Sequence, residues 1–414
     1  MRADAVANVT QAEWDSALSI ITEVRLERFK AAFKPEPIPL RPFNVLIGRN
    51  GSGKSTLVEA LQWIDTAMRR DAREACVRYW GIHDLINLRG WTKKPFFQLT
   101  VTWDGPAAQS LGTKTQYSVK VEESDSTPLI AAEDLTLLNA KGRTQTKFIS
   151  TEKGHRVVRP LGDDNQVLSH FDTDRLALAT VPITNDDSAT SPLSQQRDFW
   201  KRAVFLRLSP SRLADGSPAR RKSFEPMLDE EGQNLPALIN ELTDEQREEM
   251  VENIRRVLPA IQDVSVSEAS AGRDTRVNYS LMESMPYRGR GGKTQFPIPA
   301  WMLSEGTRRI TAVLALLAHD PPPSLLCIEE IENGLDPWTV RGLLEHLQSA
   351  QDRGTQVILT THSTWLLDHV DIQSILRVRR DGGETKYEHF ASLAEVRAFA
   401  RNIPAGTRYT NLET

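Results

Sequence analysis

The stretch that most constrains what this chain can fold into is Phe43–Leu57, which reads FNVLIGRNGSGKSTL. Phe43–Ile47 is a short apolar run of strand-forming residues. Residues 48–55 fit the pattern G-x-x-x-x-G-K-[ST], and a helix-prone sequence follows them. Strand, glycine-rich loop and helix in this order are the context that a phosphate-binding loop requires. A glycine-rich turn that binds nothing is the alternative, and the match of the full pattern in the correct context disfavours it.

The residue types in this loop match the chemistry of a bound triphosphate. Its glycines let the backbone curl with the N–H groups turned inward, where a Cβ would crowd the phosphates. The helix that opens near Gly53 adds the positive end of its dipole. We expect Lys54 to reach the β- and γ-phosphates and the Ser55 hydroxyl to ligate a bridging Mg²⁺. The predicted ATP-binding residues of the loop are Gly48, Arg49, Asn50, Gly51, Ser52, Gly53, Lys54, Ser55 and Thr56.

Composition narrows the class of protein. The 414 residues are 39% hydrophobic and 26% charged, with a formal net charge of -4, which is typical of a globular protein with a sizeable core. The two cysteines, Cys76 and Cys327, cannot build a disulfide framework, and this favours a reducing cytoplasm. No run approaches the ~18 apolar residues of a membrane span, and the first residues lack the pattern of a signal peptide. We therefore expect a cytoplasmic protein that does not enter a membrane.

Periodicity and motif positions divide the chain into five segments. The predicted segments are a tail at 1–18, a first half of the core at 19–103, an inserted region at 104–295, a second half of the core at 296–380 and a C-terminal segment at 381–414. The first half contains alternating strands over 19–29 and 96–103 and a helix over 54–70.

The inserted region has the weakest pattern. Short strand-like pieces occur at 117–121, 147–150 and 156–158, and apolar residues at helical spacing predict one helix over 235–258 that ends at Pro259. The region lacks the sustained heptads that a long coiled-coil arm requires. We interpret it as an α+β arm or regulatory region.

A second group of motifs begins near Trp301. Ser304 and Gly306 lie in MLSEGTRR, directly before an apolar helix, where a serine is by default a capping residue. Residues 325–330 are four apolar residues closed by two carboxylates, and an α/β sheet places its chemistry at such strand ends. We expect Glu329 to hold the Mg²⁺ shell and Glu330 to polarise the attacking water as general base. A pair of solvated surface acids is the alternative.

A third apolar strand predicts the last candidate residue. Residues 356–363 read QVILTTHS, so the strand ends in hydroxyls and a histidine. A lone histidine in this place is usually structural. The order of the motifs along the chain makes a γ-phosphate sensor the better interpretation of His362.

These motifs together resemble a known superfamily. GRNGSGKS, LSEGTRR, LLCIEE, NGLDP and TTHS resemble the ABC-ATPases, within them the soluble branch of SMC, RecF and OLD-type ATPases, and most of all the predicted AAA-family ATPases of bacterial anti-phage systems. The resemblance covers roughly residues 19–100 and 296–375. It implies an α/β P-loop fold of ABC-ATPase type, with a mixed sheet flanked by helices, and ATP and Mg²⁺ as cofactors.

The resemblance also implies a homodimer and further site residues. Two lobes would lie head to tail, with Ser304 and Gly306 at the γ-phosphate held by the partner's Lys54 and with Asp336 across the interface. Gln98, on a predicted strand, would be a sensor of Mg²⁺, although its spacing alone favours an exposed strand residue. The chain departs from the usual pattern in having Glu329 in place of the commoner aspartate and LSEGT in place of LSGGQ. Both departures leave the chemistry possible.

Basic residues gather in two places. The first cluster is Arg197, Lys201, Arg202, Arg207, Arg212, Arg220, Arg221 and Lys222, and the second is Arg288, Arg290 and Lys293. Such density in an acidic protein predicts a surface for the phosphate backbone of DNA or RNA. Solvated faces or intramolecular ion pairs are alternatives of equal weight.

The sequence thus predicts an ATPase whose dimer acts as a switch for a nucleic acid or an effector protein, such as a nuclease or toxin, in DNA metabolism or anti-phage defence. One alternative is the nucleotide-binding subunit of a membrane transporter, against which the long stretch between Gly48 and Ser304 argues. A fused nuclease is disfavoured because only residues 364–414 follow the last motif, too few for such a domain. A non-hydrolysing ATP-binding scaffold is the third alternative.

Overall fold

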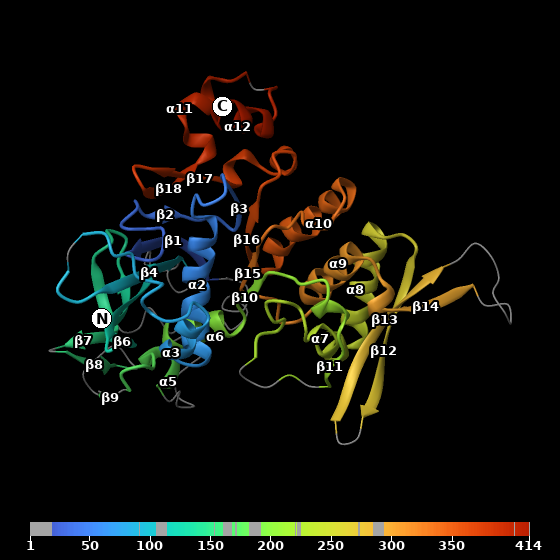
Figure 1. Ribbon diagram of the computed structural model, residues 1–414, viewed down its shortest axis with the longest axis horizontal. Helices are drawn as coiled ribbons and strands as arrows, with labels where there is room; N and C mark the ends of the chain where they lie inside the picture. The colour runs from blue at the N-terminus through green and yellow to red at the C-terminus, as the bar shows by residue number, and fades with distance from the viewer. Residues whose placement is uncertain are drawn as a thin grey trace, which may run out of the picture. The chain divides into compact units, whose positions relative to one another are not determined.

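The computed structural model describes residues 19–90, 92–104, 114–152, 154–159, 168–169, 172–181, 192–219, 221, 225–271, 274–284, 294–400 and 402–413. Within this part of the chain, contacts define two compact units, whose elements are labelled in Figure 1. The first unit comprises the described residues up to Pro42, with Gly48–Lys201 and Arg377–Glu388. The second comprises Phe43–Ile47, Arg202–Leu376 and the described residues from His389 onward. The two units therefore alternate along the sequence.

The first unit is built on an antiparallel sheet of eight described strands in the order β2-β1-β4-β5-β6-β7-β8-β9. The strands are β1 (Ile20–Glu27), β2 (Ile38–Pro39), β4 (Phe96–Asp104), β5 (Lys114–Ser124), β6 (Thr127–Leu138), β7 (Thr144–Glu152), β8 (His155–Val158) and β9 (Leu168–Ser169). Cross-strand pairing aligns Val24, Val101, Tyr117 and Leu135 in one row. All four are buried, so this row belongs to the core face of the sheet.

Helices cover that core. The helices of this unit are α2 (Lys54–Arg69), α3 (Ala72–Val77), α5 (Ala177–Thr180) and α6 (Pro192–Lys201). Trp63 of α2 meets Phe97 of β4 edge to face at 5.1 Å between ring centroids, and Phe97 meets Phe29 in the same way at 5.3 Å. Trp63 and Phe97 are almost fully buried, so the helix behind the glycine-rich loop is fixed firmly to the sheet.

The second unit contains four described parallel strands of a sheet, in the order β10-β15-β16-β3. These strands are β3 (Phe43–Ile47), β10 (Val204–Leu206), β15 (Leu325–Ile328) and β16 (Gln356–Thr361). The strands β17 (Ile375–Asp381) and β18 (Glu384–His389) lie almost wholly in Arg377–Glu388 and so belong mainly to the first unit. β10, β15, β16 and β3 pair in parallel, with Ile328 opposite Leu359 and Leu359 opposite Val45. The carboxyl ends of β15, β16 and β3 therefore meet at one edge, which is where a sheet of this kind places functional residues.

The rest of the second unit is a smaller sheet and a layer of helices. The strands are β11 (Ser217–Pro218), β12 (Ile261–Ala271), β13 (Asp274–Ser284) and β14 (Gln295–Pro299). The helices are α7 (Leu235–Glu241), α8 (Asp244–Val257), α9 (Glu305–Leu317), α10 (Pro337–Ser349), α11 (Ala394–Ala398) and α12 (Ala405–Glu413), with short 3-10 turns at Arg212–Ala214, Ala300–Met302, Ala350–Arg353, Leu366–His369, Ile372–Ser374 and Phe390–Ser392. α8 packs against both α9 and α10 (Figure 1).

Most predicted elements of the two core halves are confirmed, and the largest error lies in the inserted region. The single helix predicted over residues 235–258 is two helices. α7 ends at Glu241, and Thr243 starts α8 with a capping box, in which Thr243 and Gln246 each accept the other's backbone N–H. The apolar spacing continues across this break, so periodicity alone could not locate it. The Thr-x-x-Gln pattern is the signal that could have done so.

Candidate functional site

The glycine-rich loop forms a curled phosphate cradle in the first unit. Gly53 caps α2 in a left-handed conformation, with φ of 106°, and Gly51 has φ of 73°. Lys54 is buried, and its Nζ donates hydrogen bonds to the carbonyls of Gly48, at 2.7 Å, and Arg49, at 3.3 Å. The loop thus closes around its own lysine, while Arg49, Asn50 and Gly51 are exposed on its outer turn.

Two of the glycines are required by a strand pair that sequence reasoning did not connect to the loop. A Cβ on Gly48 would lie 2.0 Å from the carbonyl oxygen of Val378 in β17, and a Cβ on Gly53 would lie 2.7 Å from the side chain of Thr385 in β18. The hydroxyl of Tyr387, also in β18, donates a hydrogen bond of 2.8 Å to the carbonyl of Gly53. The segment Arg377–Glu388 therefore supports the loop, and no local signal in the sequence indicates it.

The loop residues fit a bound triphosphate and its metal ion. Ser52 is 4% exposed, and its Oγ has no hydrogen-bond partner among the described residues, so the cradle leaves a polar group for a ligand. Ser55 and Thr56 lie in the first turn of α2, at the positive end of the helix dipole. The described residues contain no cluster of three metal-ligating side chains. A metal ion held partly by phosphate oxygens, as Mg²⁺ usually is, does not need such a cluster.

The two acids of the second unit lie directly after β15, as predicted from the apolar run. Glu330 has φ of 51°, a left-handed backbone conformation that costs a residue with a side chain on the order of 1–2 kcal/mol. Its N–H donates to the Oγ1 of Thr360 at 3.0 Å, and its carboxylate accepts a hydrogen bond from the side chain of Asn333. Glu329 donates its own N–H to the carbonyl of Leu206. The strained backbone at Glu330 is thus held by bonds to Thr360 and Asn333, which is typical of a positioned functional group.

A charged side chain outside the predicted set faces the same acid. Arg309, on α9, interacts electrostatically with Glu305 and Glu330, and its half-burial lowers the pKa of its guanidinium from the ordinary value. The motif LSEGTRR contains this residue, but sequence spacing cannot show that α9 brings it to the end of β15. Arg309 can balance negative charge at Glu330.

His362 follows β16 and is exposed, with its backbone fixed to the next turn. Its N–H donates to the carboxylate of Glu332 at 2.7 Å. Its ring therefore lies in solvent within this unit, while its backbone position depends on the loop that follows Glu330. The candidate γ-phosphate sensor is accessible, and its role stays a prediction.

The signature-like residues are exposed at the start of α9. Ser304 caps this helix, accepting the N–H of Thr307 at 3.1 Å. A Cβ on Gly306 would lie 2.8 Å from the carbonyl of Gly334, so the absence of a side chain lets the two turns approach closely. Asp336 caps α10 by accepting the N–H groups of Trp338 and Thr339, and the Thr339 side chain and backbone bonds lower the pKa of its carboxyl. The two segments predicted to lie at the dimer interface, which contain Gly306 and Asp336, thus contact each other at the surface of the second unit.

Comparison with known proteins identifies the family. The sequence pattern of the family described as "AAA domain, putative AbiEii toxin, Type IV TA system" matches residues 43–368, most of the chain. The chain belongs to this AAA-domain family. The predicted resemblance to a branch of the ABC-type ATPases is confirmed.

Individual proteins are similar to the chain either over a short stretch of sequence or in fold. The chain is 38% identical over 68 residues to the energy-coupling factor transporter ATP-binding protein EcfA2 of Mycoplasmopsis synoviae, a match over 16% of this chain and 20% of that protein. An Smc head bound to the C-winged helix domain of ScpA aligns with a TM-score of 0.53 at 15% identity, covering 89% of this chain and 96% of that one. An Smc head with an extended coiled coil, bound to the C-terminal domain of ScpA derived from Pyrococcus furiosus, aligns at 0.51 and 13% identity over 90% and 96%.

These structural likenesses concern the fold alone. They confirm the predicted fold class of this AAA-domain protein, a mixed α/β P-loop ATPase fold shared with SMC heads. In addition, none of the helices in the described ranges is long and apolar enough to cross a membrane.

Gln98 has a local partner in this AAA domain. It lies on β4, and its amide donates to the hydroxyl of Ser118 on β5 at 2.9 Å. This hydrogen bond is what an ordinary strand residue makes, so the proposed role in sensing Mg²⁺ gains no support from the contacts of the first unit.

Many of the basic residues have partners within the chain. Arg221 pairs with Glu241, Arg212 with Glu231 at 3.3 Å, and Arg202 donates to the carbonyl of Pro322 at 3.0 Å. Arg197 donates to the carbonyl of Val181 at 2.6 Å, and burial lowers its pKa. Lys201 and Arg207 are exposed. Arg220, Lys222, Arg288, Arg290 and Lys293 lie outside the described residues. The contacts thus favour the alternative of intramolecular pairing for part of the first cluster.

Proposed function

We propose that this AAA-domain protein hydrolyses Mg-ATP and uses the reaction as a switch. The observation that carries the proposal is Glu330, a carboxylate held at the end of β15 in a strained conformation by Thr360 and Asn333. A general base gains from such positioning because the proton acceptor must stand within hydrogen-bond reach of the attacking water. The curled loop around Lys54 supports it, because it offers backbone N–H groups and one buried cation to phosphates.

The residues would divide the chemistry as follows. Lys54 and the loop N–H groups bind the β- and γ-phosphates, and Ser55 and Glu329 hold Mg²⁺, which when bound offsets the charge of the phosphate oxygens. Glu330 accepts the proton of the attacking water, and Arg309 interacts electrostatically with the same acid. His362 would act at the γ-phosphate. Each role is proposed for the residue separately, from its contacts within its own unit.

Phosphate release with matched variants tests the proposal. We expect Lys54→Ala to lose ATP binding, because the buried cation of the cradle is removed. Glu330→Gln should retain ATP binding and hydrolyse at least about a hundredfold more slowly, the usual contribution of a general base. Glu345→Gln is the control, since Glu345 is an exposed acid that pairs only loosely with Arg341 at 3.5 Å. A Glu330→Gln protein that hydrolyses at the parental rate would remove Glu330 from the role of base.

A second copy of the chain is the proposed partner in the ATP-bound state. Exposed aromatic residues flank the meeting place of Gly306 and Gly334, with Trp301 62% and Trp338 79% exposed. Large exposed side chains at one place are typical of an interaction surface. In this homodimer Ser304, Gly306 and Asp336 would face the nucleotide bound by the partner subunit.

Light scattering of the Glu330→Gln protein tests this association. Adding ATP should double the mass, and Trp338→Ala should prevent this. Trp80→Ala is the control, because Trp80 is 96% exposed and belongs to the first unit, not to the segments that contain these motifs. If Trp80→Ala and Trp338→Ala weaken the dimer equally, the proposed interface is wrong.

We further propose that the switch controls a separate effector protein or a nucleic acid in the cytoplasm, in defence or DNA metabolism. The family description, which names a putative toxin and a toxin–antitoxin system, supports an effector role. Binding to DNA should weaken steeply with rising salt if exposed Lys201 and Arg207 contact phosphates. Affinity that is independent of salt would exclude the nucleic-acid version and leave the protein partner.

A further inference from the structure

The hairpin of β12 and β13 in the second unit (Figure 1) has one side that no strand of the described residues covers. β13 pairs with β12 on one side and with β11 and β14 on the other, so β12 lies at the end of this sheet. The pairing with β13 runs along the whole of β12, from Ile261 to Ala271. In an antiparallel ladder, alternate residues direct their backbone N–H and C=O groups to opposite sides. β12 therefore presents a row of such groups to which a further strand can bind.

The strands at the other sheet ends have features that prevent such binding. β14, on the far side of β13, contains Pro297 and Pro299, and a proline has no N–H to offer to a neighbouring strand. β2, β9, β10 and β11 are only two or three residues long, and β18 carries Lys386. β12 has 11 residues, and none of them is a proline, a lysine or an arginine. Its edge thus lacks most of the devices by which proteins prevent edge-to-edge pairing.

The beginning of this edge is closed, and the part after it is open. A register shift leaves Gln262 out of the ladder, and its carbonyl accepts a hydrogen bond from Arg255 at 2.8 Å. The N–H of Val264 donates to the side chain of Asp263 at 2.8 Å. No side chain in the described part of the chain bonds to the backbone of residues 265–269. These residues are therefore available to a partner strand.

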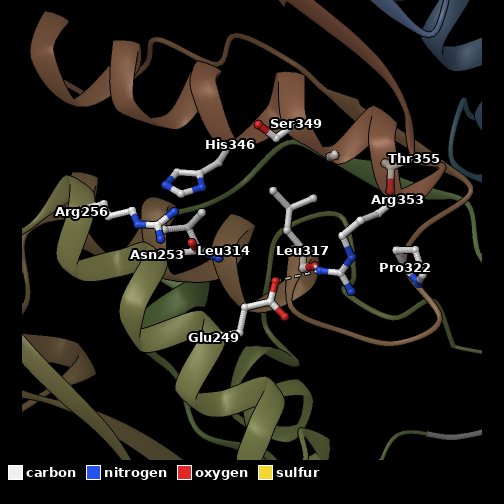
Figure 2. A pocket seen from close by; sticks show the side chains of 11 residues that line it. Glu249, Asn253, Arg256, Leu314, Leu317, Pro322, His346, Ser349, Arg353 and Thr355 are labelled. Carbon is white, nitrogen blue, oxygen red and sulfur yellow. Dashed lines mark hydrogen bonds and ion pairs between the residues drawn. The ribbon is translucent and has the colours of Figure 1, made fainter.

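The edge is held on a firm support. Val264 is buried and the partly buried Val266 packs against the same core, where α8 contacts β12. α8 is in turn joined to the turn after α10, because Glu249 pairs with Arg353 at 2.9 Å, drawn as the dashed line in Figure 2. Ser265, on the opposite face of β12, is exposed. A strand that binds here would extend a sheet with one apolar and one polar face.

We propose that the edge of β12 pairs with the same edge of a second copy of the chain. Two identical edges pair antiparallel around a two-fold axis, and residues that lie opposite each other then share one face of the joined sheet. A pairing centred on Val266 places this side chain opposite its own copy and Ser265 opposite the partner's Ser267. Apolar side chains then meet on the core face and hydroxyls on the other, and both kinds of cross-strand pair are favourable.

The two acids of β12 are compatible with this self-pairing. Asp263 and Glu268 are the charged residues of the strand, and both are exposed. They point to opposite faces because an odd number of positions separates them, so the two-fold pairing does not place one opposite the other. In the pairing centred on Val266, Asp263 lies opposite the partner's Ala269 and Glu268 lies opposite the partner's Val264. No like charges are therefore placed directly opposite each other, an arrangement that would disfavour the contact.

This contact does not rest on the proposed ATPase activity and should form without ATP. β12 ends before the segments that contain Ser304, Gly306 and Asp336, which are proposed to meet the nucleotide-bound partner. Addition of ATP to the Glu330→Gln protein would then join two such pairs, so the doubled mass would be that of four chains. Tetramers with more than one kind of two-fold contact are a common closed assembly. A mass that ATP does not change would count against the nucleotide-dependent association and leave the contact through β12 standing.

Light scattering of the full chain without nucleotide tests the proposal. We expect the parental protein to have the mass of two chains. The double variant Ser265→Lys, Ser267→Lys should have half this mass, because it places ammonium groups about 5 Å apart across the joint. Mixing it with Ser265→Glu, Ser267→Glu should restore the mass of two chains, which a variant that fails to fold would not do. A parental mass of one chain, or no restoration in the mixture, overturns the proposal.

Crosslinking through an added cysteine gives a second test with a matched control. Cys76 and Cys327 are buried, so a cysteine added on the surface reacts alone. Two copies of Ser265→Cys would lie about 7–8 Å apart, on the diagonal of the pairing. Ser280 pairs with Ser265 one strand farther in, so two copies of Ser280→Cys would be at least three strand spacings apart, roughly 14 Å. A short thiol crosslinker should join Ser265→Cys chains and leave Ser280→Cys chains single, and equal yields for the two variants would overturn the proposal.

Discussion

The hydroxyl of Tyr387 offers a sharp test of how the phosphate loop is supported. Tyr387→Phe removes one partly buried hydrogen bond of 2.8 Å to the carbonyl of Gly53, the residue that caps α2. A hydrogen bond of this kind contributes about 0.5–1.5 kcal/mol, and a carbonyl left without a donor costs somewhat more. We therefore expect Tyr387→Phe to lower the free energy of unfolding by about 1–2 kcal/mol. It should also weaken ATP binding by up to about tenfold, the equivalent of 1.4 kcal/mol.

The matched control is Tyr279→Phe. Tyr279 is fully buried and Tyr387 is 8% exposed, but the hydroxyl of Tyr279 makes no hydrogen bond among the described residues. Removing an unsatisfied hydroxyl should leave stability unchanged or raise it, and ATP affinity should not change. Urea unfolding and titration with a fluorescent ATP analogue measure both quantities. Equal losses in the two variants would refute the reasoning, because they would show a general cost of altering a buried tyrosine.

Three further predictions concern the second unit. Thr360→Val leaves the N–H of Glu330 without its acceptor, so it should lower the free energy of unfolding by about 1–3 kcal/mol and slow phosphate release. Thr355→Val removes a hydroxyl that has no partner among the described residues, so it should leave the free energy of unfolding unchanged. Urea unfolding compares the two variants. Gly306→Ala should cost about 1–3 kcal/mol by calorimetry, because its Cβ would lie 2.8 Å from a carbonyl oxygen; an unchanged melting temperature would contradict this. The folded protein holds the pKa of His346 below 6.5, so its unfolded state binds the proton first. Stability should therefore fall as pH drops through 6.5 toward the folded pKa, and His346→Gln should lose this part of the decline in urea unfolding at a series of pH values.

Features set by neighbours in the sequence were predictable, and those set by distant contacts were not. The strand β3, the loop and α2 follow from one local pattern, and β15 and β16 follow from apolar runs closed by polar residues. Tyr387 lies over three hundred residues beyond Gly53, and nothing near either residue indicates their hydrogen bond. The left-handed backbone of Glu330 is equally hidden, because the Thr360 hydroxyl that accepts its N–H belongs to another strand. The hydroxyls at the end of β16 were visible in the sequence, but their direction requires the parallel register of the sheet.

The alternation of the two units along the chain limits how the gene can be divided. A cut after Lys201 would separate the strand Phe43–Ile47 from Arg202–Leu376, although these segments form one sheet. Neither contiguous fragment would then hold a whole unit, and the carboxyl fragment would expose an edge of β16 that β3 normally covers. Split-protein sensors and truncation libraries made at this junction should therefore aggregate, unless a copy of the missing strand is supplied together with the larger piece.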